Sequence, residues 1–270
     1  MTIHNLVLGS EGFVGKSFCN YLESKDEVVT RFDIKLSDKQ DLRYAKLNFK
    51  EIDRIYFLAW EVGGSKYLYK SNTQLDQLNW NMTLLTNVMP QIQESGLPFL
   101  FVSSQLAEVT DLAYGIMKRV GEVWSDQIGG VKVRLWNVYG PVEIPSERTH
   151  VIADLIYQAI TENKIRLMTT GEEKRQFIHI DDVCNAFHTA ISLRSPDLYD
   201  VTSFEWVSIR DVAKIISDCT GAEVKYGTIK GSTPLTPMKG KIHGWNPQVS
   251  LELGIQRMIK NMQDYLEVRH

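Results

Sequence analysis

The sequence predicts an α/β protein in which helices cover both faces of a doubly wound parallel sheet. Three observations support this fold class. Short apolar runs alternate with helical patterns through the first half of the chain, the first run leads into a glycine-rich turn, and small or polar residues follow several of the runs. Ligands of such sheets bind beyond the carboxyl ends of the strands, so we expect the functional site at that edge.

Length and composition limit the functions to be considered. The 270 residues are enough for one large domain, or for a domain with a smaller lobe. The net charge of -3 gives no indication of a nucleic-acid partner, and no apolar stretch is long enough to span a bilayer. Cys19, Cys184 and Cys219 have neither metal-binding nor disulfide spacing, and we expect each to be a small buried side chain. Because no signal peptide is recognisable either, a cytoplasmic protein without a bound metal or membrane partner is expected.

The first strand and the turn after it form the pattern on which the functional prediction depends. An apolar run, Ile3–Leu8, is followed by Gly9, Gly12 and Gly15, and a helical pattern then begins. In a strand–turn–helix unit the first glycine allows a tight turn, the second lets the backbone approach a pyrophosphate, and the third lets the helix pack on the strand. The N–H groups at the helix start would bind the phosphates. The alternative is that the glycines only shape the turn.

The second predicted strand, 28–33, ends in an acidic residue. Asp33 lies eighteen residues after Gly15, where a carboxylate can accept hydrogen bonds from both ribose hydroxyls of an adenosine. The same charge would repel a 2′-phosphate, which favours NAD over NADP. Arg31 and Lys35 lie near enough to leave NADP open, and a turn aspartate is the alternative to a cofactor ligand.

Two further strands are expected before the helix that carries the chemistry. Arg54–Ala59 predicts the third strand, and a helix over about 75–94 separates it from a fourth strand, Phe99–Val102. Ser103 and Ser104 follow that fourth strand directly, so they are expected at the same edge of the sheet as the glycine turn and Asp33.

The next predicted helix contains Tyr114 and Lys118, which are four residues apart and therefore neighbours on the helix surface. An ammonium group near a phenol lowers the pKa of the tyrosine from its usual value of about 10. Such a tyrosine can act as a general acid/base near neutral pH, and a nearby serine could orient the substrate hydroxyl. Gly121 and Ser125 lie on the same flank, where we expect a cleft. The pair alone is weak evidence, because chance Tyr-x-x-x-Lys pairs are common.

The remaining side chains of this helix predict which of its faces is buried. We expect its apolar residues to face the core and its charged residues to face solvent. The apolar residues are Ala113, Ile116, Met117, Val120, Val123, Trp124 and Ile128, and the charged residues are Arg119, Glu122 and Asp126.

The strand–helix alternation becomes less regular after the next strand, 132–136. Gly140–Pro141 marks a break, so we expect residues 1–140 to form the nucleotide-binding domain and residues 141–270 to form mainly a substrate-binding lobe. The chain is expected to return to the first domain around residues 176–200. His179 is flanked by apolar residues and is expected to be a packed histidine.

Together these features resemble the extended short-chain dehydrogenase/reductase superfamily, in its NAD-dependent nucleotide-sugar epimerase/dehydratase family. The resemblance covers nearly the whole chain. The residues that carry it are Gly9-x-x-Gly12-x-x-Gly15, Asp33, Asp41–Arg43, Phe57–Ala59, Asn81, Ser103–Ser104, Tyr114-x-x-x-Lys118, Arg134–Pro141, Arg175–Asp182 and Gly244–Pro247.

The resemblance implies a Rossmann domain that binds NAD and a smaller C-terminal lobe that binds a nucleoside-diphosphate sugar. It also implies that Tyr114 is the catalytic acid/base, that Lys118 tunes it and binds the nicotinamide ribose, and that Ser104 or Ser103 holds the reacting hydroxyl. Many relatives form dimers through the two helices that here contain Asn81 and Tyr114, so a homodimer is expected.

The resemblance further implies which residues contact the ligands. Asn137 and Arg175 resemble the residues that contact the sugar nucleotide and its phosphates in the family. The residues implied to bind NAD are Gly9, Gly12, Phe13, Val14, Gly15, Asp33, Asp41, Leu42, Leu58, Ala59, Trp60, Asn81, Tyr114 and Lys118.

Three features depart from the family pattern. The link from Ser104 to Tyr114 is much shorter than in most relatives, and the stretch between Asp33 and Asp41 is also reduced. Trp60 stands where relatives usually have a small residue, so its indole could narrow the cofactor pocket or stack on a ligand.

The first functional interpretation is an NAD-dependent enzyme that transfers hydride at one hydroxyl-bearing carbon of a nucleotide sugar, most simply as C4 epimerisation. A nucleotide-sugar reductase or dehydrogenase with the same site is an alternative. A non-catalytic NAD(H)-binding sensor or scaffold is a further alternative from another class, although such relatives usually lose the tyrosine or the lysine.

The residues after Ser103 and Ser104 indicate which reactions of the family this chain lacks the groups to catalyse. Dehydrating relatives carry an Asp-Glu pair there, and relatives that epimerise carbons next to a ketone carry a cysteine paired with a histidine. This chain has Gln105, whose amide is not a practical acid or base. Glu108 is expected to be a solvated glutamate, and His179 would lack a cysteine partner.

Overall fold

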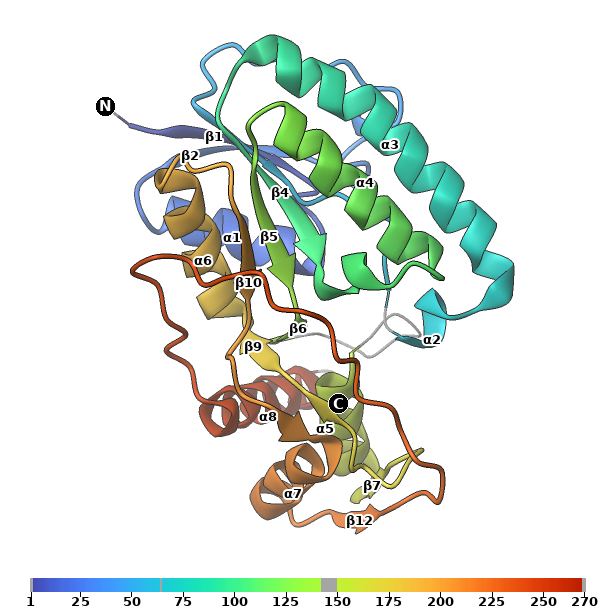
Figure 1. Ribbon diagram of the computed structural model, residues 1–270. Coiled ribbons are helices and arrows are strands. Elements are labelled where there is room, and N and C mark those ends of the chain that lie inside the picture. Colours follow the sequence, from blue (N-terminus) through green and yellow to red (C-terminus); the bar gives the residue numbers. More distant parts are fainter. Residues whose placement is uncertain (1, 64, 142–149, 269–270) are drawn as a thin grey trace.

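The computed structural model describes residues 2–63, 65–141 and 150–268. Figure 1 shows a larger part, in which helices flank a central sheet, and a smaller part below it that contains the C-terminal helix. Among the described residues no helix combines the length and the apolar composition needed to cross a membrane.

The central sheet has six strands, all parallel, in the order β10-β5-β4-β3-β1-β2. The strands are β1 (His4–Leu8), β2 (Val28–Phe32), β3 (Arg54–Phe57), β4 (Phe99–Ser104), β5 (Val131–Leu135) and β10 (Leu198–Val201). Leu8 pairs in register with Phe32 on one side and with Phe57 on the other, so β1, β2 and β3 end at the same level. The strand order reverses direction between β1 and β3, which places the expected ligand crevice at the end of β1. The predicted fold class is confirmed.

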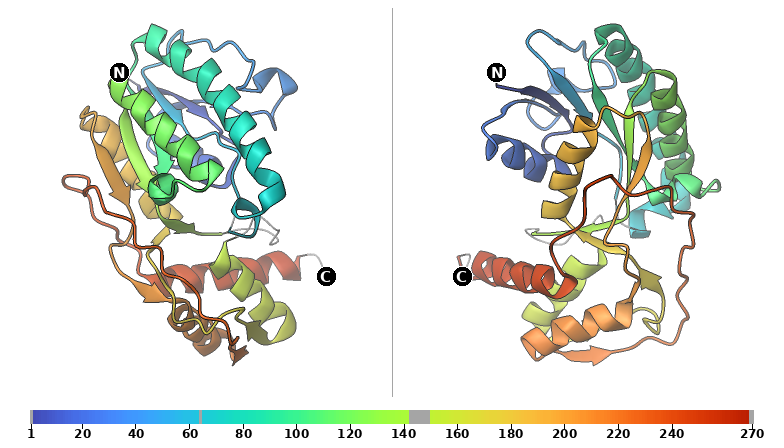
Figure 2. Two further views of the ribbon diagram at one scale, coloured as in Figure 1. Left: turned by 45° about the vertical axis from the view of Figure 1, so that its right-hand side comes forward. Right: turned by 60° about the vertical axis from the view of Figure 1, so that its left-hand side comes forward.

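Helices cover both faces of the sheet. Helices α1 (Phe13–Glu23) and α6 (Ile180–Ser192) lie on one face, and α3 (Gln74–Ser95) and α4 (Ala113–Gln127) lie on the other (Figures 1 and 2). The first face is fixed by Phe18, whose ring lies 4.6 Å from that of Tyr56 in β3 and 5.4 Å from that of Phe187 in α6. An apolar cluster fills the space between the sheet and the helices on each face.

The smaller part has an apolar core of its own. Its helices are α5 (Val151–Glu162), α7 (Ile209–Thr220) and α8 (Leu251–Glu267). Short strands pair in twos: β6 (Asn137–Tyr139) with β9 (Phe177–His179), β7 (Lys164–Arg166) with β12 (Glu223–Lys225), and β8 (Lys174–Arg175) with β11 (Val207–Ser208). A four-residue helix, α2 (Ser65–Leu68), precedes α3.

A long connecting segment, 226–250, begins and ends in the smaller part and runs along the larger part between these ends. Figure 1 shows it in orange and red, running from β12 up to β10 and back down to α8. Asp200 in β10 accepts a hydrogen bond from the backbone N–H of Gly240 at 3.2 Å, and Asp182 in α6 accepts from those of Gln248 and Val249, each at 2.9 Å. Buried carboxylates therefore hold this segment against the sheet and α6.

The prediction for the faces of α4 is wrong at several residues. Glu122 is fully buried, whereas Ile116 and Val123 are 40% and 47% exposed. The reason is that α4 packs against both α3 and the sheet, so its buried arc includes Glu122 and its outer face keeps apolar residues. The expected cleft is also absent at Gly121, because a Cβ there would lie 2.3 Å from the Phe101 ring. Cys219, expected to be buried, is exposed.

Candidate active site

The glycine turn packs so closely that only glycine fits at two of its positions. Gly9 has a φ of +92°, and a Cβ there would lie 2.5 Å from the Ala59 backbone nitrogen. A Cβ on Gly15 would lie 2.0 Å from the Gly9 carbonyl oxygen. Gly12 is the N-cap of α1 and no side chain caps the helix. The first-turn N–H groups, those of Phe13 and Val14 among them, are therefore available to an anion, as in a phosphate-binding turn.

Asp33 lies beside this turn and is 8% exposed. Its Oδ2 accepts a hydrogen bond from the backbone N–H of Glu11 at 3.0 Å, and its Oδ1 accepts from that of Lys35 at 2.9 Å. A carboxylate can accept about four hydrogen bonds, so two positions remain for ribose hydroxyls. The glycine turn, the uncapped helix and this carboxylate together fit a dinucleotide.

Ser104, Tyr114 and Lys118 lie together at the end of β4. Tyr114 and Ser104 are hydrogen-bonded through their side chains. Lys118 is 3% exposed, and its Nζ donates to the Val102 carbonyl oxygen at 2.6 Å. The Nζ lies 5.9 Å from the centroid of the Tyr114 ring.

The two serines have different surroundings. The Ser103 hydroxyl donates to the buried Glu122 Oε1 at 2.6 Å. Ser104 keeps its hydroxyl at Tyr114 and also accepts from the Leu106 backbone N–H at 3.2 Å. Both partners belong to α4, with Tyr114 in its first turn and Glu122 about two turns further along the helix.

The expected lowering of the tyrosine pKa is wrong for this structure. Burial raises the pKa of Tyr114 to about 12, and the hydrogen bond from Ser104 opposes this only in part. Burial also lowers the pKa of Lys118 well below its usual range, against the attraction of Glu122. The Lys118 ammonium contacts Val102 and Trp60, so it does not offset the rise in the pKa of Tyr114 that burial causes.

One of those groups is Trp60, the residue that departs from the family pattern. The Lys118 Nζ lies 3.8 Å from the centroid of the Trp60 ring, a short cation–π contact. The indole also packs edge-on against Phe101 at 5.7 Å, and its buried Nε1 has no hydrogen-bond partner among the described residues. Trp60 therefore covers the lysine that the resemblance assigns to the cofactor.

Other residues implied to bind NAD hold the backbone near the crevice. The backbone N–H groups of Leu58 and Ala59 donate to Leu8, and Asn81 binds the Glu61 backbone N–H at 2.9 Å through its Oδ1. Leu42 is buried next to Asp41, whose carboxylate accepts from Arg43, at 2.5 Å in the shortest contact.

The two residues expected to contact the sugar nucleotide lie where the large and small parts meet. Asn137, the first residue of β6, donates through Nδ2 to the Gln176 carbonyl at 3.0 Å. Arg175 in β8 donates to the carbonyl of Ser232 at 2.9 Å, and partial burial lowers its pKa. These bonds fix both side chains at the junction, and among the described residues no hydrogen bond or ion pair joins either side chain to Tyr114.

A buried ionic network behind Ser104 was not predicted from the sequence. Arg134, 1% exposed, donates to Glu122 at 2.6 and 2.7 Å and to Glu108 at 2.6 Å. Lys239 of the connecting segment lies 2.8 Å from Glu108. The lysine and the arginine lower the pKa of Glu108 to about 2. The signal for this network was an arginine within a strand of buried residues, which requires a carboxylate partner.

His179, the other candidate acid/base, caps a helix. Its Nδ1 accepts from the Asp181 backbone N–H at 3.2 Å at the start of α6, and its ring packs against Tyr139 at 5.3 Å. Burial lowers its pKa. The expectation of a packed histidine is met.

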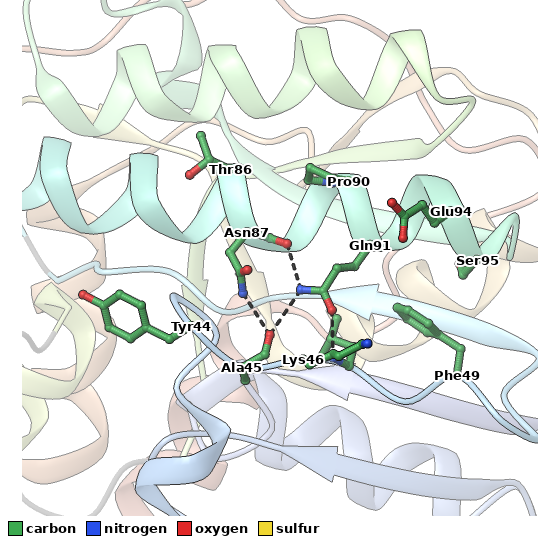
Figure 3. Close-up of a pocket in the computed structure, with 11 residues that line it drawn as sticks. Tyr44, Ala45, Lys46, Phe49, Thr86, Asn87, Pro90, Gln91, Glu94 and Ser95 are labelled. Carbon is green, nitrogen blue, oxygen red and sulfur yellow. Dashed lines mark hydrogen bonds between the residues drawn. The ribbon is translucent and has the colours of Figure 1, made fainter.

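A separate surface cavity of about 570 Å³ lies between residues 44–49 and α3 (Figure 3). Its amides hold the adjoining loop: Asn87 and Gln91 donate to the Ala45 carbonyl at 2.9 and 3.1 Å. The cavity lies along the second half of α3, toward the amino ends of the strands, and none of the expected site residues lines it.

Comparisons with known proteins agree with this geometry. The model of the NAD dependent epimerase/dehydratase family matches residues 5–201. GDP-L-fucose synthase 1 of Arabidopsis thaliana is 27% identical over 301 residues, covering 93% of this chain and 90% of that protein. dTDP-L-rhamnose 4-epimerase of Burkholderia thailandensis is 32% identical over 139 residues, covering 46% of this chain and 37% of that protein.

Solved structures show the same fold over nearly the whole chain. TunA, an NAD-dependent NDP-hexosamine 5,6-dehydratase, has a TM-score of 0.82 at 20% identity, covering 97% of this chain and 98% of that one. WbmF of Bordetella bronchiseptica in complex with NAD⁺ has a TM-score of 0.79 at 20% identity, covering 99% and 94%.

Proposed function

This chain belongs to the NAD dependent epimerase/dehydratase family, whose enzymes use NAD, and from that membership we propose that it transfers hydride at one hydroxyl-bearing carbon of a nucleoside-diphosphate sugar, as a C4 epimerase. The relatives named above act on GDP-, dTDP- and NDP-linked sugars by their names, which supports this class of substrate.

Three features of the chain support NAD at the end of β1. The N–H groups at the start of α1 would bind the pyrophosphate, and Asp33 would accept hydrogen bonds from the adenosine ribose. Lys118 and the loop held by Asn81 would adjoin the nicotinamide half. Bound NAD supplies the acceptor and donor of hydride.

Ser104 and Tyr114 carry the proton transfer. Because their hydroxyls are hydrogen-bonded to each other, both can reach one substrate hydroxyl. Tyr114 takes the proton of that hydroxyl as hydride leaves the carbon, and returns it when hydride comes back to the opposite face of the sugar. For this to occur near neutral pH, the pKa of Tyr114 has to fall from about 12, which we assign to the Lys118 ammonium turning from Trp60 toward the phenol.

The observation that carries the proposal is that, among the described residues, the three groups considered as a second acid/base, Gln105, Glu108 and His179, are each engaged elsewhere or unsuited to the task. Glu108, four residues after Ser104, is bound by Arg134 and Lys239 with its pKa at about 2, so it stays ionised at neutral pH. Gln105 is an amide, and His179 caps α6. Loss of water or proton exchange at carbon needs such a second group, whereas hydride transfer at one carbon does not.

A reductase is the second candidate function. dTDP-4-dehydro-6-deoxy-D-allose reductase of Streptomyces bikiniensis, 23% identical, aligns over 80% of this chain. A reductase would use the same Ser104, Tyr114 and Lys118, with the proton moving from Tyr114 to the sugar.

Turnover in D₂O separates these reactions. We expect that, from a panel of nucleotide sugars incubated with NAD, one is converted to its C4 epimer without deuterium at any ring carbon and with its C6 oxygen retained, as followed by NMR. A product formed only with stoichiometric NADH would identify a reductase. Ring deuterium or loss of the C6 oxygen would contradict the single-carbon mechanism.

Two further parts of this proposal concern organisation. Residues 1–140 with 176–200 form the nucleotide-binding domain, and the rest of 141–270 forms the substrate lobe. The protein is a homodimer through α3 and α4, supported by the exposed apolar residues Leu75, Met82, Ile116 and Val123 on these helices. They adjoin a surface hollow of about 490 Å³ lined by Val120, Trp124 and Ile128.

A further inference from the structure

Glu11 is an acidic residue inside the glycine turn, at a position that the Gly9-x-x-Gly12 pattern leaves open. Its backbone N–H donates to Asp33 Oδ2 at 3.0 Å, so the residue lies beside the carboxylate that we assign to the ribose. Its own side chain is only 15% exposed. A second, mostly buried carboxylate therefore adjoins the adenosine end of the crevice.

Glu11 also engages Arg31 and Lys35, the two basic side chains that left NADP open. Its carboxylate lies 3.6 Å from Arg31 Nη1 and 3.8 Å from the exposed Lys16 Nζ, and it accepts from the Ser10 hydroxyl at 3.3 Å. Its backbone carbonyl accepts from Lys35 Nζ at 3.1 Å. The other end of the Arg31 guanidinium donates to Glu23 at 3.0 and 3.2 Å. The sequence left NADP as an alternative cofactor because of Arg31 and Lys35. In the structure both side chains bind Glu11 of the glycine turn.

We propose that Glu11 is a specificity-determining residue that excludes the 2′-phosphate of NADP. A phosphate on the ribose bound by Asp33 would meet two carboxylates instead of one. Arg31, the cation that could neutralise it, is already paired with Glu11 and Glu23. Because Glu11 is mostly buried, solvent and salt screen its charge less than that of an exposed residue. The inference rests on the proposed role of Asp33 and adds a second determinant to it.

The isosteric change Glu11→Gln tests the charge alone. The amide keeps an oxygen that can accept from Ser10, removes the negative charge, and leaves Arg31 with one carboxylate. In calorimetric titrations of the full-length protein without sugar nucleotide, we expect NADP to bind at least about tenfold more tightly than to the unmodified protein, as for one gained charge-assisted hydrogen bond. NAD affinity should change by less than about threefold.

Two further variants locate the effect. Adding Arg31→Met to Glu11→Gln should remove most of the gain in NADP affinity, because the released guanidinium is the expected phosphate partner. Glu23→Gln is the matched control: it removes the other carboxylate of Arg31 and leaves Glu11 in place, so NADP affinity should not rise. Thermal unfolding checks that each variant is folded, and Glu11→Ser replaces Glu11→Gln if the latter is not.

The outcomes distinguish this inference from the proposed function. An unchanged ratio of NAD to NADP affinity in Glu11→Gln, or an equal gain in Glu23→Gln, would show that Glu11 does not set the preference, even where Asp33→Ala weakens NAD binding. Failure of the unmodified protein to bind NAD would overturn the role of Asp33 together with that of Glu11.

Discussion

The pKa of Tyr114 depends on the surroundings of the side chain more than on the neighbouring lysine in the sequence. Four-residue spacing brings Lys118 to the same flank of α4, but the ammonium group contacts Val102 and Trp60, and burial raises the pKa of the phenol to about 12. The free protein therefore holds Tyr114 protonated at neutral pH, ready to donate a hydrogen bond to a substrate oxygen.

Replacing Tyr114 by phenylalanine removes the proposed acid/base and keeps the ring. We expect Tyr114→Phe to lower kcat on the true substrate by about 10²–10⁴-fold. NAD affinity should be nearly unchanged, because the hydroxyl lies at Ser104 and not at the glycine turn. Steady-state kinetics and calorimetry measure the two effects. Full turnover by the variant would exclude the assigned role.

Trp60 stabilises the charged form of Lys118, at a position where burial disfavours that form. A desolvated cation–π contact favours the charged form of the lysine. Trp60→Leu should therefore lower the pKa of Lys118 further, so the alkaline fall in kcat/KM moves to lower pH.

Trp60→Phe is the matched control, because it retains an aromatic face. Its alkaline fall in kcat/KM should lie close to that of the unmodified protein. If the pH profiles of Trp60→Leu and the unmodified protein coincide, the ring does not tune the lysine. A loss of activity without a change of profile would indicate packing alone.

At the scale of elements, β4, β5 and α4 are joined by charges as well as by apolar contacts. Ser103 of β4, Arg134 of β5 and Glu122 of α4 form one hydrogen-bonded cluster, which extends through Glu108 to Lys239 of the connecting segment. The strand end that carries Ser104 is thereby fixed to the helix that carries Tyr114. Such fixed positions are what proton transfer between hydroxyls requires.

The ion pairs of Glu108 with Arg134 and Lys239 make the stability of the folded state depend on pH in the acid range. Its pKa is about 2 in the folded protein, below the usual 4.5, so its ionised form stabilises the fold above pH 4.5 and this contribution is lost as the pH falls toward 2. We expect the free energy of unfolding in urea to fall less between pH 4.5 and 2.5 in Glu108→Gln than in the unmodified protein. The exposed Glu94 of α3 offers the control Glu94→Gln, which should follow the unmodified protein. Equal slopes for all three would contradict the role of Glu108.

At the scale of the molecule, the outer faces of α3 and α4 are the surface on which the dimer proposal depends. Val123 is 47% exposed, so Val123→Asp should leave the protomer folded and convert the dimer to monomers in sedimentation equilibrium. Leu253→Asp, at a 41% exposed leucine of α8 in the small lobe, should leave the dimer intact. A monomeric unmodified protein, or a dimeric Val123→Asp, would place the interface elsewhere or exclude it.

The fold class and the family could be determined from the sequence by itself, because both depend on local patterns. A buried strand, the Gly9 turn and the start of α1 are contiguous, and the close approach of Gly9 to Ala59 permits no other residue there. The positions of Ser104 and Tyr114 followed in the same way, from a strand end and from helical spacing.

Only the tertiary structure decided how the charged side chains are used. Glu122 was expected in solvent and Glu108 was expected to be solvated, yet both bind Arg134, a residue of another strand. The assignment of Ser103 to Glu122 and of Lys118 to Trp60 likewise depends on partners that are distant in sequence. The physical reason is that periodicity reports which face of an element is apolar, whereas the pKa and the role of a buried charge depend on the groups that other elements bring against it.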